Sequence, residues 1–248
     1  MSFFFDKNLR EKISHKIRMR EIGQLTKLWD HPIKGIFKCV QEFPKYGDIQ
    51  SLPKKLRETY TISIMGLALM EDSKLDWWVS VPDGDPPDGF IGTFAEESNG
   101  YTGLMREVEV VEHRTVAENL FETLSKKMTE KSYGTNTTLA CLLLTPDVYD
   151  LEALSEKISN LHSKLDHVFV IFSGGMYEDI RSGKFDPKLI YTMVQLLPVY
   201  ERLTFSIERF MTDFNDRYQK GQESRLIDGD MMYYGTTNKS HAGNPSAK

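Results

Sequence analysis

Two strand-like segments joined by a polar stretch carry the acidic residues best placed for chemistry. Residues 88–94 (DGFIGTF) and 104–111 (LMREVEVV) are rich in aromatic and β-branched side chains, which favour strands. Asn99-Gly100 between them is a strong hairpin signal. With that pair at the centre of the turn, Asp88 would lie opposite Val111, in a register good to about two residues; a slip of one residue would reverse every face.

In this register three carboxylates would project from one side of the hairpin. Opposed residues share a face, and so do residues two apart on one strand, so Asp88, Glu107 and Glu109 would lie together. Carboxylate oxygens are the ligands that Mg²⁺ (or Mn²⁺) prefers. The same pattern has a plain structural explanation, because Glu-Val-Glu-Val suits any half-exposed strand and Pro-Asp-Gly suits a turn.

The hairpin residues resemble the signature of the PD-(D/E)XK, or restriction-endonuclease-like, nuclease superfamily. Pro87-Asp88 matches its first half, and Glu107-Val108-Glu109 matches its second half with Glu in place of the motif Lys. A second alignment takes Glu109 as the motif acid and puts Val111 where the Lys should be, which questions activity. The resemblance covers about residues 52–173.

This resemblance implies Mg²⁺-dependent hydrolysis of DNA phosphodiester bonds. Asp88 would bind the metal, Glu107 would be a second ligand and the carbonyl of Val108 a third. Glu109 would act as a further ligand or as a base toward the attacking water. The superfamily often has another acid on the helix before the hairpin, and Glu58 is the position that we nominate. Its neighbours Lys54, Lys55 and Arg57 favour the simpler interpretation of an exposed Glu58 without a functional role.

Some members of the superfamily carry the catalytic lysine on the helix after the hairpin. Here that helix is predicted over 115–131, and Lys126 or Lys127 would compensate for the Glu at position 109. The simpler interpretation is intrahelical ion pairing with Glu118 and Glu122.

A basic helical face is predicted at the beginning of the chain. Residues 6–29 have helical spacing of apolar side chains, and Lys12, Lys16 and Arg20 lie among the basic residues of the opposite face. Such a face is either a solvated helix surface or an arm that contacts DNA phosphates, as Lys126 and Lys127 also would.

Strands and helices alternate along the chain and predict an α/β fold of the α+β type. We expect a central mixed sheet, with the carboxylate-bearing hairpin flanked by helices and preceded by an N-terminal helical segment. The predicted domains are a helical extension (1–50), a nuclease-like core (51–235) and a disordered tail (236–248). The predicted elements, in order, are a helix at 51–71, a strand at 75–81, the hairpin, a helix at 115–131, a strand at 137–145, a helix at 151–165, a strand at 167–173, a short helix from 187, a strand at 203–207 and a helix at 210–218.

Composition is that of an ordinary globular protein. The 248 residues are 40% hydrophobic and 27% charged, with a formal net charge of −5. This acidity counts mildly against nucleic-acid binding. Two cysteines make no disulfide framework or zinc pattern, and no apolar run reaches membrane-spanning length, which predicts a cytoplasmic protein without membrane attachment.

Three functions follow from these observations. The first is a metal-dependent endonuclease that acts on DNA in restriction, defence or a mobile element, for which the resemblance implies a homodimer. The second is a nuclease-like domain without activity that serves as a binding or scaffold subunit. The third is an unrelated α/β interaction domain whose hairpin acids simply face solvent.

Overall fold

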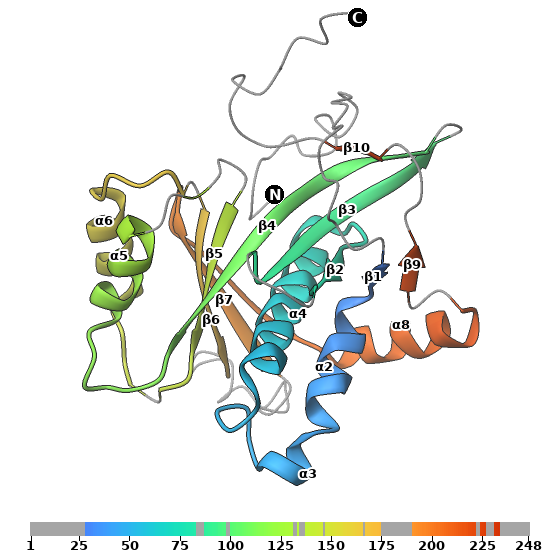
Figure 1. The fold of residues 1–248 in the computed structure, drawn as a ribbon, viewed down its shortest axis with the longest axis horizontal. Coiled ribbons are helices and arrows are strands. Elements are labelled where there is room, and N and C mark those ends of the chain that lie inside the picture. The colour runs from blue at the N-terminus through green and yellow to red at the C-terminus, as the bar shows by residue number, and fades with distance from the viewer. Residues whose placement is uncertain are drawn as a thin grey trace, which may run out of the picture.

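The strands form one mixed sheet that runs through the middle of the molecule (Figure 1). The computed structural model describes residues 28–82, 87–97, 100–130, 133, 137–145, 147–165, 167–174, 190–221, 224–226 and 231–233. Within these residues the sheet has ten strands in the order β8-β7-β6-β5-β4-β3-β2-β1-β9, and β10 pairs with β4. The strands are β1 (Leu28–Asp30), β2 (Trp78–Ser80), β3 (Gly89–Glu97), β4 (Gly100–His113), β5 (Thr137–Leu143), β6 (His167–Ser173), β7 (Ile190–Leu197), β8 (Glu201–Ser206), β9 (Ser224–Leu226) and β10 (Met231–Tyr233).

Helices cover both faces of the sheet (Figure 1). On one face lie α2 (Pro32–Val40), α4 (Lys54–Ser73) and α8 (Glu208–Gln219), and on the other lie α5 (Leu120–Glu130) and α6 (Leu151–Ser159); the short α3 (Phe43–Tyr46) links α2 to α4. Each face has its own hydrophobic core. Strands β5 and β6 are buried from end to end almost without interruption, because helices cover them on both sides.

The predicted α/β architecture is confirmed, including its order around the hairpin. Helix α4 is followed by the antiparallel strands β2, β3 and β4, then by α5, and then by β5, which pairs in parallel with β4. All residues from Glu58 to Met70 of α4 are buried, because the helix lies between the sheet and α2. The predicted helix at 51–71 and strands at 137–145 and 167–173 are therefore correct to within a few residues.

The predicted N-terminal helix is wrong at its end. Leu28–Asp30 form strand β1, which pairs with β2 and β9 at one side of the sheet. Residues 1–27, with Lys12, Lys16 and Arg20, lie outside the described residues. His31-Pro32 begins helix α2, which packs on α4, and the Cys39 thiol donates a hydrogen bond to the Leu56 carbonyl (3.1 Å). Residues on both sides of the boundary predicted near residue 50 thus contribute to one core.

Other differences concern the ends of elements. Helix α5 begins at Leu120 rather than 115, because the Asn119 side chain accepts the Phe121 N–H and so caps the first turn. Helix α6 ends at Ser159, earlier than the predicted residue 165. Ile190 and Tyr191 belong to β7, so the short helix predicted from 187 is wrong there; residues 187–189 and the tail at 236–248 lie outside the described residues.

None of the described helices is long and apolar enough for a membrane span.

His31 caps α2 from inside the core. Its Nδ1 accepts the Ile33 N–H (3.3 Å), so the ring proton is on Nε2, which has no hydrogen-bond partner among the described residues. The imidazole is 1% exposed and packs against Trp78 and Phe214. Such a ring is stable only while it is neutral.

Burial lowers the pKa of His31 to about 4, with a further lowering by the positive charge of Arg217 and an opposing effect of Asp76. The unfolded chain binds the proton near pH 6.5. As the pH falls below 6.5 the unfolded state therefore gains protons first, and the stability that the neutral ring preserves is lost progressively down to about pH 4.

We expect His31→Asn to weaken the acid sensitivity of the fold. Asn keeps a side-chain acceptor at the N-cap but does not titrate. Between pH 7 and pH 4, the wild type should lose up to about 3 kcal/mol more unfolding free energy than the variant in urea titrations. The control is His162→Asn at an exposed position, which should behave like the wild type; an equal acid response of both variants would contradict this role of His31.

Candidate functional site

The register of the hairpin decides which acids come together. Gly89 pairs with Val108 and Glu97 pairs with Gly100, so the turn lies between 97 and 100, one residue before the predicted centre. One further step along this register places Asp88 opposite Glu109 rather than opposite Val111. The observed register thus differs from the predicted one by two residues, at the limit of the predicted range, and since the shift is even, positions 88, 107 and 109 keep the common parity of the prediction.

Asp88 directly precedes β3, at the point beyond which β4 has no pairing with β3. Its carboxylate Oδ2 accepts the backbone N–H of Val110 (2.7 Å), in the place where a longer β3 would supply a carbonyl. Gly89 makes this position possible, because a Cβ there would lie 2.9 Å from the Ser80 carbonyl oxygen and 2.5 Å from Ile62 Cδ1. The carboxylate is therefore held in the plane of the sheet, beside β4.

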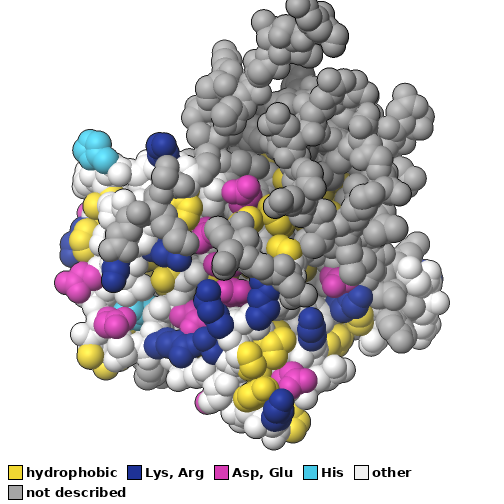
Figure 2. All heavy atoms as spheres, in the orientation of Figure 1, with side chains coloured by type: hydrophobic (Ala, Val, Ile, Leu, Met, Phe, Trp, Pro, Cys, Tyr) yellow, Lys and Arg dark blue, Asp and Glu magenta, His cyan; other side chains and the backbone are white. Residues whose placement is uncertain are grey.

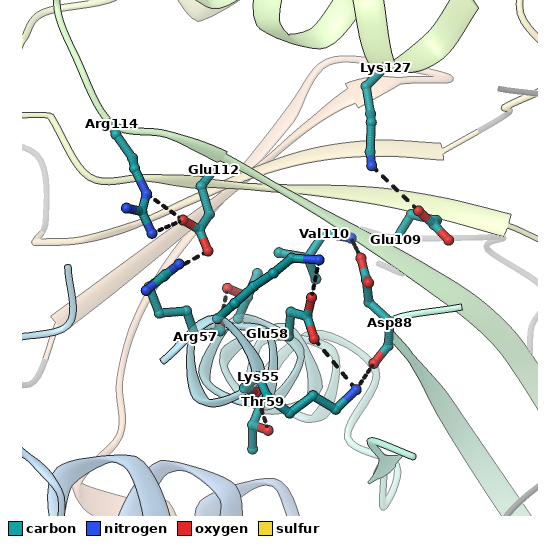
Figure 3. A network of polar contacts seen from close by, with 12 residues as sticks. Lys55, Arg57, Glu58, Thr59, Asp88, Glu109, Val110, Glu112, Arg114 and Lys127 are labelled. Atoms are coloured by element: carbon teal, nitrogen blue, oxygen red, sulfur yellow. Dashed lines mark hydrogen bonds and ion pairs between the residues drawn. The ribbon is translucent and has the colours of Figure 1, made fainter. Parts of the chain in front are cut away.

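Glu109 is a buried acid on the α5 side of β4. It is 4% exposed, and its Oε2 lies 3.7 Å from Nζ of Lys127 on α5. The neighbouring Lys126 is exposed. The structure thus brings Lys127 to a strand carboxylate, as the lysine-compensation hypothesis requires and as intrahelical pairing alone would not (Figure 3).

Glu58 approaches the same region from α4, on the opposite side of the sheet from Lys127 (Figure 3). It is 4% exposed and forms ion pairs with Lys54 (3.0 Å) and Lys55 (3.5 Å). The Lys55 ammonium also donates to the Asp88 carbonyl at 3.4 Å. The prediction of an exposed Glu58 is therefore wrong, because the side chain is buried and ion-paired with two lysines of its own helix.

Glu107 has a different partner. It is half-buried and accepts the Thr137 hydroxyl proton (3.0 Å) at the start of β5. It shares the α5 side of β4 with Glu109, but it lies two residues further from Asp88. Continued by one residue, the register therefore places Asp88 opposite Glu109 rather than opposite Glu107.

Sequence reasoning missed a further acid of β4, Glu112, which lies on the other side of the strand and binds two arginines. Glu112 faces α4 and binds Arg57 (Nε to Oε1, 2.7 Å) and Arg114 (Nε to Oε2, 2.6 Å). The alternation of side chains along the strand could have indicated this, because even-numbered positions from Val108 to Glu112 face α4. Figure 2 shows Lys and Arg side chains interleaved with Asp and Glu on the face in view, between α5 and α4.

The donors suit a magnesium ion more than a softer metal. Asp88 and Glu109 offer carboxylate oxygens, and Mg²⁺ is commonly held by one or two carboxylates, with waters and substrate phosphates completing its coordination. No cluster of three or more His, Cys, Asp or Glu side chains among the described residues is placed to hold a metal ion. Asp88 and Glu109 thus offer two hard oxygen donors, and the described residues form no all-protein cage for a metal ion.

Three other reactive side chains among the described residues, those of Cys39, Cys141 and His113, are engaged or inert. Burial raises the pKa of the Cys39 and Cys141 thiols to about 12, so both stay protonated, as expected for Cys141 within its apolar strand. His113 is buried, and its ring nitrogens lie 3.0 Å from the Thr123 hydroxyl and 2.9 Å from the Tyr149 hydroxyl. Burial lowers the pKa of His113, and the arrangement is typical of a structural histidine.

Two substitutions of Asp88 should separate its structural role from its charge. Asp88→Ala leaves the buried N–H of Val110 without its acceptor and should lower the unfolding free energy by about 1–2 kcal/mol. Asp88→Asn keeps an acceptor oxygen and should stay within about 0.5 kcal/mol of the wild type. Urea unfolding at neutral pH measures both, and equal stability of the Ala variant and the wild type would contradict the capping role.

Comparison of the chain with protein-family models, with curated proteins and with solved structures gives no match. The interpretation of the site therefore depends on the residues, their contacts and the topology that brings them together.

Proposed function

We propose that this protein is a Mg²⁺-dependent endonuclease of the PD-(D/E)XK type that hydrolyses DNA phosphodiester bonds. The single observation that carries the proposal is that the Asp88 carboxylate binds β4 at Val110, the residue after Glu109, while Lys127 Nζ lies 3.7 Å from the Glu109 carboxylate. Two acids and one lysine are the residue types of the motif. Here the lysine comes from α5, while Val111 takes its usual place on the strand.

The topology supports the same proposal. The resemblance implies a helix followed by three strands and a second helix. The chain has this succession in α4, β2–β3–β4 and α5, and β5 follows. The parallel pairing of β4 with β5 brings α5, and hence Lys127, over the middle of β4.

Each side chain has a distinct task in this proposal. Asp88 and Glu109 would hold the cation, which would supply a nucleophile near neutral pH and charge stabilisation on the phosphate. Lys127 places its ammonium beside Glu109, where it offsets negative charge that develops on the phosphate. The Lys55 ammonium binds both the Glu58 carboxylate and the Asp88 carbonyl, and so holds the main chain at Asp88 close to α4.

Exposed cations around the acids would contact the DNA backbone. Lys54 and Arg114 have side chains that are 75% and 46% exposed, and Lys126 is exposed on α5. They compensate locally for the net charge of −5. Because such contacts release counterions, binding should weaken steeply as salt is raised.

The proposal is tested with supercoiled plasmid and single-stranded DNA, each with Mg²⁺, Mn²⁺ or EDTA. The wild type should cut with either metal and not with EDTA, whereas Asp88→Asn and Glu109→Gln should cut at least about 100-fold more slowly because the cation loses a charged ligand. The Asn variant is informative because its fold should be intact. Cutting by the wild type in EDTA, or undiminished cutting by both variants, would reject this site.

The two neighbouring lysines of α5 offer a matched comparison. Lys127→Met should lower kcat about 100-fold by removing the ammonium beside Glu109, and Lys126→Met at the exposed position should change kcat less than about threefold. Thermal unfolding of both variants is the control for stability, because Lys127→Met removes the ammonium that is paired with the buried Glu109. Equal kcat values for the two variants would remove Lys127 from the mechanism.

A second candidate is a catalytically silent nuclease-like subunit that binds or scaffolds a partner. Two observations favour it: Val111 in the strand position of the lysine, and ion pairs that bind lysines to Glu58 and Glu109. This candidate predicts no cutting by the wild type under any metal condition and no thermal shift with Mg²⁺. The cutting assay therefore decides between the two functions.

A further inference from the structure

Tyr133 lies in the connection between α5 and β5, next to the acidic side of β4. Helix α5 ends at Glu130 and β5 begins at Thr137, which binds Glu107. The Tyr133 side chain is 8% exposed and belongs to the hydrophobic core that α5 and α6 form with the sheet. It is therefore on the same side of the sheet as Glu107 and Glu109.

The hydroxyl of Tyr133 is buried without a hydrogen-bond partner among the described residues. A buried phenol normally finds a partner, because its desolvated O–H is otherwise unfavourable. In contrast, the hydroxyls of Tyr60 and Tyr191 bond to each other at 2.8 Å, and that of Tyr149 contacts His113. The exception lies beside the proposed catalytic acids.

Electrostatics makes Tyr133 a permanent donor. Burial and the negative charges of Glu109 and Asp88 raise the pKa of its phenol well above the usual range. The group therefore stays protonated at any physiological pH and carries no charge. A neutral donor near two carboxylates can serve an anionic oxygen without adding to the repulsion between the acids and that oxygen.

We propose that the Tyr133 hydroxyl donates a hydrogen bond to a non-bridging phosphate oxygen of the substrate, and so is a further substrate-binding residue of the site. This inference rests on the proposed endonuclease function. An anionic phosphate beside Asp88 and Glu109 needs donors in addition to the cation. Lys127 offers one from α5, and the connection after α5 offers the second.

The test compares Tyr133→Phe with Tyr149→Phe. Removing the unpartnered hydroxyl of Tyr133 should leave the Tm equal to or above that of the wild type. Tyr149→Phe removes a hydroxyl with two partners, His113 and Thr145, and should lower the Tm. Neither variant should change the thermal shift that Mg²⁺ causes, because neither residue is a proposed metal ligand.

Binding and turnover give the second readout. Tyr133→Phe should bind a DNA oligonucleotide, with Ca²⁺ in place of Mg²⁺ to prevent cutting, about tenfold more weakly, and should lose about tenfold in kcat/KM. Per molecule of folded protein, Tyr149→Phe should retain wild-type affinity and kcat/KM.

The outcomes separate this inference from the function on which it rests. Failure of the wild type to cut DNA would overturn both. A cutting wild type combined with unchanged affinity and kcat/KM in Tyr133→Phe would overturn the inference alone. A Tm loss in Tyr133→Phe as large as that in Tyr149→Phe would also overturn it, because the hydroxyl would then have a partner in the free protein.

Discussion

The candidate site depends on where β3 begins along β4. Pairing of Gly89 with Val108 leaves the N–H of Val110 without a strand partner on that side, and the Asp88 carboxylate accepts it instead. A side-chain oxygen thus replaces a backbone carbonyl in the sheet. Because the acid is fixed by the ladder itself, its position is as well determined as that of the strands, which is what a metal-binding or catalytic group needs.

The alternation of β4 distributes charge between the two helical layers. Odd-numbered positions turn Glu107 and Glu109 toward α5, while Glu112 turns toward α4. Charges that are this buried are costly unless they are paired, and each of these acids has a partner: Thr137, Lys127 and Arg57. The partners belong to β5 and to the helices on both sides of the sheet, so the acids also hold the layers in register.

Much of the fold was predictable because its signals are local. The continuous apolar runs of β5 and β6 identify buried strands, and Pro53 marks the start of the central helix α4. The common parity of positions 88 and 109 was also predictable, but the turn of the Asp88 carboxylate into the plane of the sheet was not. The start of α2 at His31-Pro32 carried a local signal as well, because Pro favours a first helical turn, but a longer helical pattern upstream concealed it.

The sequence by itself determined the α/β class, the order of helix, hairpin, helix and strand, and the acids of the hairpin, because periodicity and turn chemistry act over a few residues. Only the tertiary structure decided that Asp88 neighbours Glu109, that Glu58 is buried, and that Lys127 rather than Lys126 reaches the acids. Those outcomes depend on strand register and on how α4 and α5 are rotated against the sheet. Contacts between residues far apart in the sequence set both, and no short pattern records them.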